Sequence, residues 1–261
     1  MKIYIMTDIE GISGICCKDY ISAANGRPDL VAESRRLMAL DINACIEGCF
    51  RGGATEVIVK DCHGAGYNVK RCDIDPRADL ICGDTPRYRM ADVDDCDGVI
   101  LLGYHAMAGT IGAVLEHTFS STGYQHIWLN GREAGEIGID AAIAAEHKVP
   151  VIMVAGDDKA CLEAAEWLPG VVTCETKKGF SCNGCRMPAL EKSHALITEK
   201  AAQAVQKCKS IKMIELEYPI EWKVELVSRC RVPDNTAYQI SDCRTYTLKA
   251  DSVEKAFFFN W

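Results

Sequence analysis

The run Gly98-Val99-Ile100-Leu101-Leu102 is one of the two longest apolar stretches of this 261-residue chain, and Gly103-Tyr104-His105 follows it directly. No polar residue interrupts the run, so it lacks the alternation of a strand that has one face in water. An uninterrupted apolar run of this length is typical of a central strand in a parallel sheet that helices cover on both faces. The pattern therefore predicts an α/β protein with a histidine at the carboxyl end of a central strand.

Short apolar runs of the same kind alternate with helical patterns on both sides of this stretch. Further strands are expected at residues 2–7, 55–59, 79–81 and 150–154, and helices at residues 30–50, 136–147 and 157–167. Alternation of strands with helices is typical of βαβ units. The predicted fold class is α/β, with a mostly parallel sheet flanked by helices.

The pattern changes after Pro169-Gly170. From there the expected elements are a helix at 189–207, an alternating strand at 217–227, a partner strand at 245–248 and a last helix at 252–259. Earlier in the chain, Asn130-Gly131 fits the tight turn of a β-hairpin. The sequence thus predicts an α/β domain over residues 1–168 and a smaller appended α+β region over residues 169–261.

Charge and composition exclude several classes of protein. With 37 acidic and 29 basic residues the net charge is −8, and such a surface repels the backbone of a nucleic acid. No run reaches the roughly 18 uncharged apolar residues that a membrane-spanning helix needs. Asp8 and Glu10 interrupt the first apolar run too early for a signal peptide, and the 15 cysteines, an odd number, fit reduced thiols. We expect a cytoplasmic protein with no nucleic-acid and no membrane partner.

Titratable side chains follow three of the expected strands. Asp8 and Glu10 come directly after the first strand, and their alternation lets both carboxylates converge. His63 follows the second strand, and His105 follows the apolar run. Ligands of open α/β sheets bind beyond the carboxyl ends of the strands, so we expect these side chains to meet at one edge.

Glu136, at the start of an expected helix, adds a third carboxylate to this set. Two imidazoles and three carboxylates suit zinc, with manganese, cobalt and iron as less favoured alternatives. One carboxylate can also bridge two cations, as in hydrolases with two metal ions. Taken singly, each residue equally fits a cap or a turn, so the metal site rests on their coincidence at one edge.

Other motifs carry less information. His117 fits either an ordinary polar residue before a loop or a general acid–base group. Cys182-Asn183-Gly184-Cys185 is a single CxxC pair, for which we expect a reduced loop. Phosphate-binding glycine motifs and a GxSxG nucleophile elbow are absent from the sequence, which argues against nucleotide binding and serine hydrolase chemistry.

Several motifs follow one another in a characteristic order over about the first 160 residues. They are Asp8-Ile9-Glu10-Gly11-Ile12-Ser13-Gly14, Asp61-Cys62-His63-Gly64, Gly103-Tyr104-His105-Ala106, His117-Thr118 and Gly135-Glu136-Ile137-Gly138. In this order they resemble the D-aminopeptidases of the DppA type, peptidase family M55. Two positions depart from the family pattern, because Met6 and Cys62 stand where the family usually has serine.

The resemblance implies a zinc-dependent aminopeptidase that removes an N-terminal D-amino acid from short peptides. It implies two zinc ions per subunit, with Asp8 bridging them and His117 as the catalytic histidine. The implied metal ligands are Asp8, Glu10, His63, His105 and Glu136. It also implies a homo-oligomer that forms a closed ring, with a decamer as the expected size.

Two other functions fit the same residues. One is a metal-dependent amidohydrolase or deacylase that acts on another small amide. The other is a non-catalytic module that binds a metal or a peptide in the cleft. Substrates with D-, L- and N-acylated ends separate the first from an aminopeptidase, and the absence of turnover identifies the second.

Overall fold

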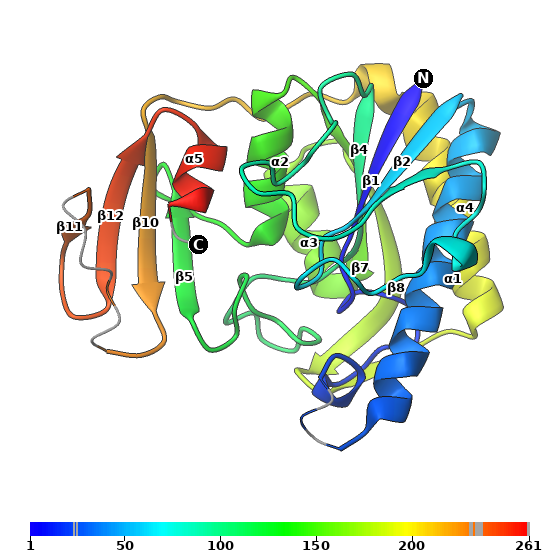
Figure 1. Ribbon diagram of the computed structural model, residues 1–261, viewed down its shortest axis with the longest axis horizontal. Helices are drawn as coiled ribbons and strands as arrows, with labels where there is room; N and C mark the ends of the chain where they lie inside the picture. Colours follow the sequence, from blue (N-terminus) through cyan, green and yellow to red (C-terminus); the bar gives the residue numbers. More distant parts are fainter. Residues whose placement is uncertain (23, 25, 230–231, 233–236, 260–261) are drawn as a thin grey trace.

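The computed structural model describes residues 1–22, 24, 26–229, 232 and 237–259. Among these residues, one sheet has seven strands in the order β3-β2-β1-β4-β7-β8-β9 (Figure 1). Its strands are β1 (Lys2–Thr7), β2 (Glu56–Asp61), β3 (Asp79–Ile81), β4 (Gly98–Tyr104), β7 (Val151–Asp157), β8 (Val172–Ser181) and β9 (Gly184–Arg186). Every neighbouring pair is parallel except β8 and β9. We call this sheet A.

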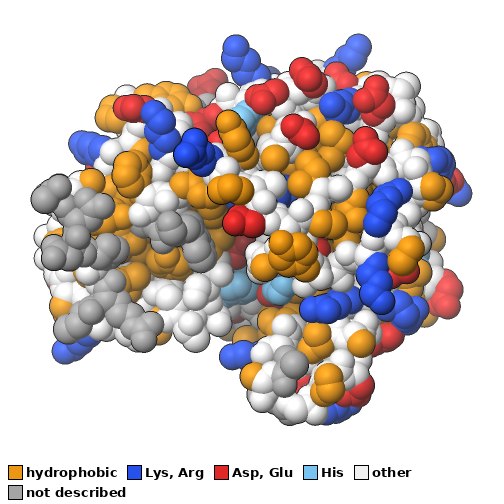
Figure 2. Space-filling view, in the orientation of Figure 1, with side chains coloured by type: hydrophobic (Ala, Val, Ile, Leu, Met, Phe, Trp, Pro, Cys, Tyr) orange, Lys and Arg blue, Asp and Glu red, His pale blue; other side chains and the backbone are white. Residues whose placement is uncertain are grey.

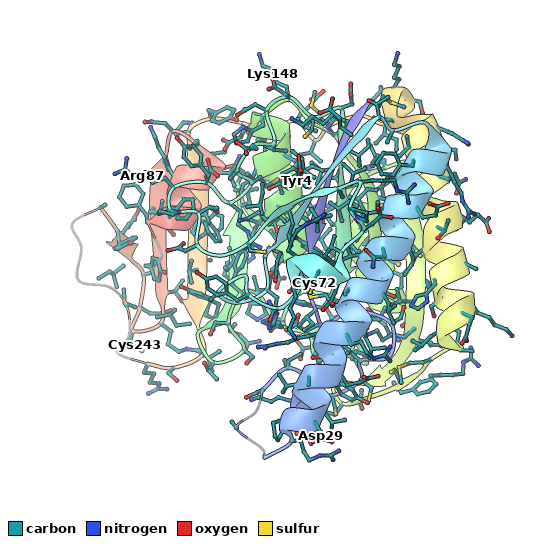
Figure 3. All side chains as sticks on the ribbon, turned by 45° about the vertical axis from the view of Figure 1, so that its right-hand side comes forward. Tyr4, Asp29, Cys72, Arg87, Lys148 and Cys243 are labelled. Atoms are coloured by element: carbon teal, nitrogen blue, oxygen red, sulfur yellow. The ribbon has the colours of Figure 1, made fainter. Side chains whose placement is uncertain are left out.

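Two long helices cover one face of sheet A. They are α1 (Pro28–Gly52) and α4 (Leu190–Lys207). In Figure 3, α1 extends from Asp29 in its first turn along the outside of the sheet, with α4 beside it. Ile3 and Ile5 of β1 point to this side and are fully buried with Ile42 of α1 and Ile197 of α4. Burial of these side chains holds the helices on the sheet.

The opposite face of sheet A carries α2 (Glu136–Glu146) and α3 (Asp158–Trp167), and beyond them lies a second sheet. Five further strands of the described chain form this sheet B, in the order β11-β12-β10-β5-β6. They are β5 (Tyr124–Leu129), β6 (Arg132–Glu133), β10 (Ile220–Leu226), β11 (Gln239–Ile240) and β12 (Thr245–Ala250). The last helix, α5 (Val253–Phe258), follows β12 and packs close to α2. Short 3-10 turns complete the chain at Lys18–Tyr20, Arg71–Asp73 and Cys208–Ser210.

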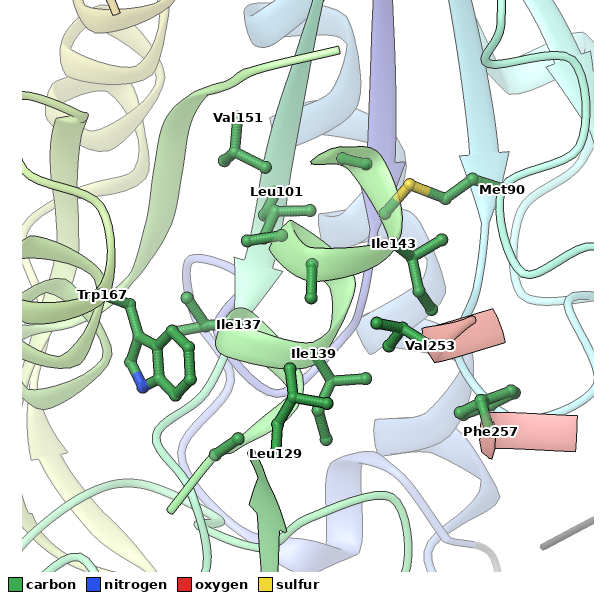
Figure 4. Packing of buried hydrophobic residues seen from close by; sticks show 14 of the residues in the cluster. Met90, Leu101, Leu129, Ile137, Ile139, Ile143, Val151, Trp167, Val253 and Phe257 are labelled. Atoms are coloured by element: carbon green, nitrogen blue, oxygen red, sulfur yellow. The ribbon is translucent and has the colours of Figure 1, made fainter. Parts of the chain in front are cut away.

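Helix α2 lies at the centre of the hydrophobic core between sheet A and sheet B. It is apolar on nearly all sides, since it contacts sheet A, sheet B, α3 and α5. Figure 4 shows Ile137 and Ile143 of this helix surrounded by side chains from these elements, which include Leu101, Leu129, Trp167, Val253 and Phe257. A helix buried in this way is fixed firmly, and so is the residue with which it begins.

The structure confirms the predicted fold class, a mostly parallel α/β sheet flanked by helices with an added antiparallel part. The sequence did not predict β8 and β9. The division at residue 168 stays a prediction, and both sheets contain strands from either side of it: β8 and β9 belong to sheet A, and β5 and β6 belong to sheet B. Within the described chain, no helix combines the length and the apolar character needed to cross a bilayer.

The strand register places the predicted site residues at one edge. Thr7 at the end of β1 pairs with Asp61 of β2 and with Leu102 of β4, so the three strands end at nearly the same height. Two glycines then let the chain segments approach closely. A Cβ on Gly11 would lie 2.1 Å from the carbonyl oxygen of Tyr104, and one on Gly103, at φ +75°, would lie 2.4 Å from that of Asp8. Any larger residue at either position would push the ligand-bearing loops apart.

Candidate metal centre

Three of the predicted residues form a first triad, Asp8, Glu10 and His63. Asp8 and Glu10 follow β1 and are buried, and His63 follows β2 and is partly buried. His63 Nδ1 lies 3.1 Å from Asp8 Oδ1 and 3.4 Å from Glu10 Oε2. One ligand atom from each residue lies within 4.8 Å of those of the other two, which is compact enough for a single cation.

A second triad consists of His105, His117 and Glu136. His105 follows β4, Glu136 begins α2, and His117 comes from the loop between β4 and β5. Glu136 Oε1 lies 3.2 Å from His105 Nε2 and 3.8 Å from His117 Nε2. The two imidazole rings stack, with centroids 4.0 Å apart and planes 10° from parallel. This triad also meets the 4.8 Å condition.

The carboxylate of Asp8 connects the triads. Its Oδ1 faces His63 in the first triad, and its Oδ2 lies 3.4 Å from His105 Nε2 in the second. A carboxylate that presents one oxygen to each of two ligand groups has the arrangement of a bridging ligand. The structure thus brings together all six residues that the sequence singled out.

Hydrogen bonds fix the two histidines of the second triad so that Nε2 points into the cluster. His105 Nδ1 lies 3.0 Å from the carbonyl oxygen of Ala106, and His117 Nδ1 lies 2.9 Å from that of Leu115. A carbonyl oxygen only accepts hydrogen bonds, so in both rings Nδ1 carries the proton and the neutral ring has its lone pair on Nε2. This is the usual way in which a protein prepares histidine for a metal.

Two buried atoms of the cluster have no hydrogen-bond partner. They are Glu10 Oε2 and His105 Nε2. Burial of unpartnered polar atoms is costly, and here both belong to the ligand atoms of the triads. The nitrogen and oxygen donors present fit zinc, since zinc accepts imidazole and carboxylate ligands together.

The cluster strongly perturbs the ionisation of its members. Burial by itself raises the pKa of Asp8, but the close imidazoles of His105 and His63 outweigh burial and hold that pKa well below its usual range. Burial lowers the pKa of His63 and of His105, but neighbouring carboxylates, chiefly Glu10 and Glu136 respectively, raise both well above the usual range. Without a cation, protonated imidazoles balance the carboxylates, and a divalent cation would take over this role with release of those protons.

A polar network behind Glu136 was not predicted from the sequence. Arg89 donates to both oxygens of Asp140 at 3.0 Å and lies 3.8 Å from Glu136 Oε2. The hydroxyl of Tyr104 donates to Asp140 Oδ2 at 2.7 Å, and the backbone N–H of Phe119 donates to Glu136 Oε1 at 2.7 Å. Asp140 could have been found, because it lies one helical turn after Glu136 in an otherwise apolar helix.

Lys177 of β8 supports the first triad in a similar way and was also missed. Its buried ammonium donates to the carbonyl oxygens of Glu10, Ile12 and Ile15, each at 2.7 Å. It thereby holds the loop that carries Glu10, although burial lowers its pKa to about 8. No local pattern marked Lys177, because the strand that contains it was not predicted.

A cavity of about 560 Å³ opens beside the cluster. It is lined by Asp8 and His63 of the first triad and by His117 and Glu136 of the second, together with Lys60, Arg89, Phe119, Phe257 and Phe258. Histidine side chains are visible near the middle of the molecular face in Figure 2. The cavity lets a small substrate reach both triads.

Among the described cysteines, Cys62 lines the cavity but lies outside both triads. Burial raises the pKa of the Cys62 thiol well above its usual range, so it stays protonated beside His63. Cys182, at the turn between β8 and β9, and Cys185, in β9, are free thiols, and neither lines the cavity.

A buried cluster of carboxylates and histidines at the carboxyl edge of a parallel sheet, open to a cavity, defines a metal-dependent hydrolase. The family model described as D-aminopeptidase, peptidase family M55, matches residues 1–259. The chain belongs to this family, so the membership expected from its motifs is confirmed, as is its class, a peptidase.

Two comparisons with individual proteins agree with the family. The chain is 37% identical over 214 residues to a D-aminopeptidase of Bacillus subtilis (strain 168), covering 81% of this chain and 76% of that protein. It also resembles the solved structure of the Zn-dependent D-aminopeptidase DppA from Bacillus subtilis, a self-compartmentalizing protease. That match has a TM-score of 0.92 at 32% identity and covers 99% of this chain and 94% of the other.

Proposed function

We propose that this chain is a zinc-dependent aminopeptidase that removes the N-terminal residue, a D-amino acid, from short peptides. The observation that carries the proposal is Asp8, whose two oxygens face two buried triads that both border one cavity. The residues that would hold two zinc ions are Asp8, Glu10, His63, His105 and Glu136. Bound zinc polarises a peptide carbonyl and lowers the pKa of a water toward neutrality.

His117 has a different role from His105, although both belong to the second triad. His105 is 1% exposed and does not line the cavity, whereas His117 is 16% exposed and does. His117 Nε2 can therefore reach a substrate, while the bond from its Nδ1 to Leu115 holds the ring in place. In this proposal His117 carries a proton and donates it to the nitrogen of the departing peptide.

Other side chains keep the site in its working shape. Arg89 and Asp140 fix Glu136, and Lys177 fixes the loop of Glu10. Phe119 and Phe257 line the cavity with apolar surface and limit the water that competes for the reacting groups.

The decisive experiment measures metal content and turnover on the same sample. Protein purified without chelator should contain two zinc ions per chain and should hydrolyse D-alanyl p-nitroanilide faster than the L-isomer. The His105→Ala variant should lose this activity while remaining folded, and His126→Ala, which removes a histidine of β5, serves as the matched control. Protein that carries only traces of zinc, manganese, cobalt or iron, and gains no activity from any of them, would contradict the proposal.

A substrate panel separates the alternatives. Hydrolysis confined to N-acylated amides would identify a deacylase or another amidohydrolase. Thermal stabilisation by peptides without turnover of any substrate would identify a binding module.

We also propose a homo-oligomeric ring, with ten copies as the expected size, that works in the cytoplasm. The structural relative is described as self-compartmentalizing, and the described cysteines of this chain are all free thiols, which suits a reducing compartment. Mass photometry should give one species near ten times 28.6 kDa. A monomer at micromolar concentration contradicts the ring.

A further inference from the structure

The cavity beside the metal centre contains a buried lysine, Lys60, that neither triad uses. Lys60 of β2 is 5% exposed and lines the cavity that reaches both triads. Its Nζ donates one hydrogen bond, at 2.9 Å, to the hydroxyl oxygen of Thr85. That hydroxyl gives its own proton to the carbonyl oxygen of Tyr88 at 2.8 Å, so it can only accept from the lysine.

Lys60 has no ionic partner within the described part of the chain. Asp61, the next residue, uses its carboxylate for the backbone N–H and side-chain amide of Asn68. Asp84 also lines the cavity but is exposed to solvent and makes no ion pair with Lys60. Burial lowers the pKa of Lys60, and the nearby Asp61 and Asp84 offset this effect only in part, so the ammonium lacks a direct counter-charge. A carboxylate that entered the cavity would supply that charge and would accept the remaining ammonium protons.

We propose that Lys60 binds the C-terminal carboxylate of the peptide substrate and so selects short peptides with a free C-terminus. Lys60 in β2 precedes His63 by three residues, so their Cα atoms lie at most about 10–11 Å apart, and both residues line the same cavity. An extended peptide advances at most about 3.3–3.6 Å per residue. The distance therefore suits a carboxylate one to three residues beyond the bond that is cut.

The chemistry of the cavity supports this orientation. Asp8 and Glu136 carry negative charge at the end where the reaction occurs, and Lys60 lies outside both triads. The other cation on the wall, Arg89, is already paired with Asp140. Among the described lining residues, Lys60 is thus the cation that remains for an anionic end of the substrate.

The test rests on the proposed aminopeptidase activity and compares two substrates that differ only at the C-terminus. The zinc-loaded enzyme is assayed with a D-alanyl dipeptide as the free acid and as the C-terminal amide. The ratio of kcat/KM for acid over amide should exceed about ten in the wild type and should fall about tenfold to a hundredfold in Lys60→Met, chiefly through KM for the acid. Lys60→Arg should recover part of the ratio.

Matched controls separate recognition from a structural role. Lys249→Met removes an exposed strand lysine that does not line the cavity and should leave the ratio unchanged. The zinc content of Lys60→Met should equal that of the wild type. In the wild type itself the ratio should approach one for acid and amide forms of a hexapeptide, whose end lies beyond Lys60, and this comparison needs no variant to fold.

The outcomes distinguish the two levels of inference. If the wild type cuts neither dipeptide, the proposed function fails. If it cuts acid and amide equally well, or if Lys60→Met keeps the full ratio, the aminopeptidase stands and the role of Lys60 is wrong. An amide that carries an acidic side chain and is cut as well as the free acid shows that Lys60 reads a side-chain carboxylate instead, which also overturns the proposal.

Discussion

The two triads have similar ligands but are built by different means. The first triad takes all three residues from loops that directly follow β1 and β2, so the register of two parallel strands sets its geometry. The second triad combines a strand end, a long loop and the start of α2, so its geometry depends on packing between sheet A and that helix. Strand register alone positions ligands at strand ends. Ligands that come from both a sheet and a helix also need side chains that fix the helix relative to the sheet.

The supports differ accordingly. Lys177 holds the loop of Glu10 through three carbonyl oxygens. The second triad relies on the side chains of Arg89, Asp140 and Tyr104 behind Glu136. The charges differ as well, since the first triad has two carboxylates and one imidazole and the second has the reverse.

The largest effect is expected from Asp8, because its carboxylate faces both triads. Asp8→Ala removes the carboxylate that faces both triads, so zinc content should fall from two ions to fewer than one and kcat/KM should drop by about a thousandfold or more. Elemental analysis and hydrolysis of a D-alanyl substrate measure both quantities. Asp251→Ala, at an exposed position, is the control. Two retained zinc ions in Asp8→Ala would show that Asp8 is no bridge.

The next effect distinguishes a ligand from a catalytic group within the second triad. His117→Gln should lower kcat by about a hundredfold to a thousandfold through loss of proton transfer, while zinc content stays at two ions per chain. His105→Ala, by contrast, should lose one zinc ion together with activity. If His117→Gln loses zinc as well, His117 is a ligand, and the assignment of roles is wrong.

The sequence allowed the first triad to be predicted more completely than the second. Asp8, Glu10 and His63 were marked by short apolar strands that end in polar residues, a local pattern that parallel pairing converts into proximity. His117 lacked such a pattern, so its residue type left an ordinary polar residue and a general acid–base group both open, and only the resemblance favoured the catalytic role. The position of His117 is set by the conformation of a loop and by stacking on His105. Neither feature produces a periodic pattern in the sequence.

The same difference explains what was missed in the fold. β5 pairs with β10, which lies about 90 residues later in the chain, since Trp222 is opposite Leu129. Local periodicity indicates that a strand exists but does not identify its partner. β8 was missed because lysines at positions 177 and 178 interrupt its apolar pattern, and the first of these is the buried lysine that supports Glu10.

The two supports can be weakened separately. Lys177→Met should reduce zinc affinity of the first triad, and Asp140→Asn should reduce that of the second, each by about tenfold to a hundredfold. Titration with a chelator should therefore release one zinc ion early in each variant. In Lys177→Met this ion comes from the first triad, and in Asp140→Asn it comes from the second. Spectra of cobalt-substituted protein can assign which site empties. Equal loss from both sites in both variants would show that the triads do not have separate supports.

The smallest effect concerns a histidine at the outer end of the second support. The carboxylate of Glu254 in α5 accepts a hydrogen bond from the backbone N–H of Arg89 at 2.6 Å, and His147 Nε2 lies 3.9 Å from the same carboxylate. Glu254, together with Asp94, raises the pKa of His147 from 6.5 to about 9. Because the folded pKa is the higher one, the stabilisation is complete below pH 6.5 and is lost as the pH rises through 9.

Solvent limits the size of this contribution, since Asp94 is 76% exposed, so we expect about 1 kcal/mol or less. Thermal unfolding of zinc-loaded wild type and His147→Gln should therefore differ by about 2–3 °C at pH 6.5 and should converge by pH 9.5. The melting temperature of the wild type should fall toward that of His147→Gln between pH 6.5 and 9.5, because only the wild type carries the titrating imidazole beside Glu254. A difference in melting temperature that stays constant from pH 6.5 to 9.5 would mean that protonation of His147 does not stabilise the α5 side of the second triad.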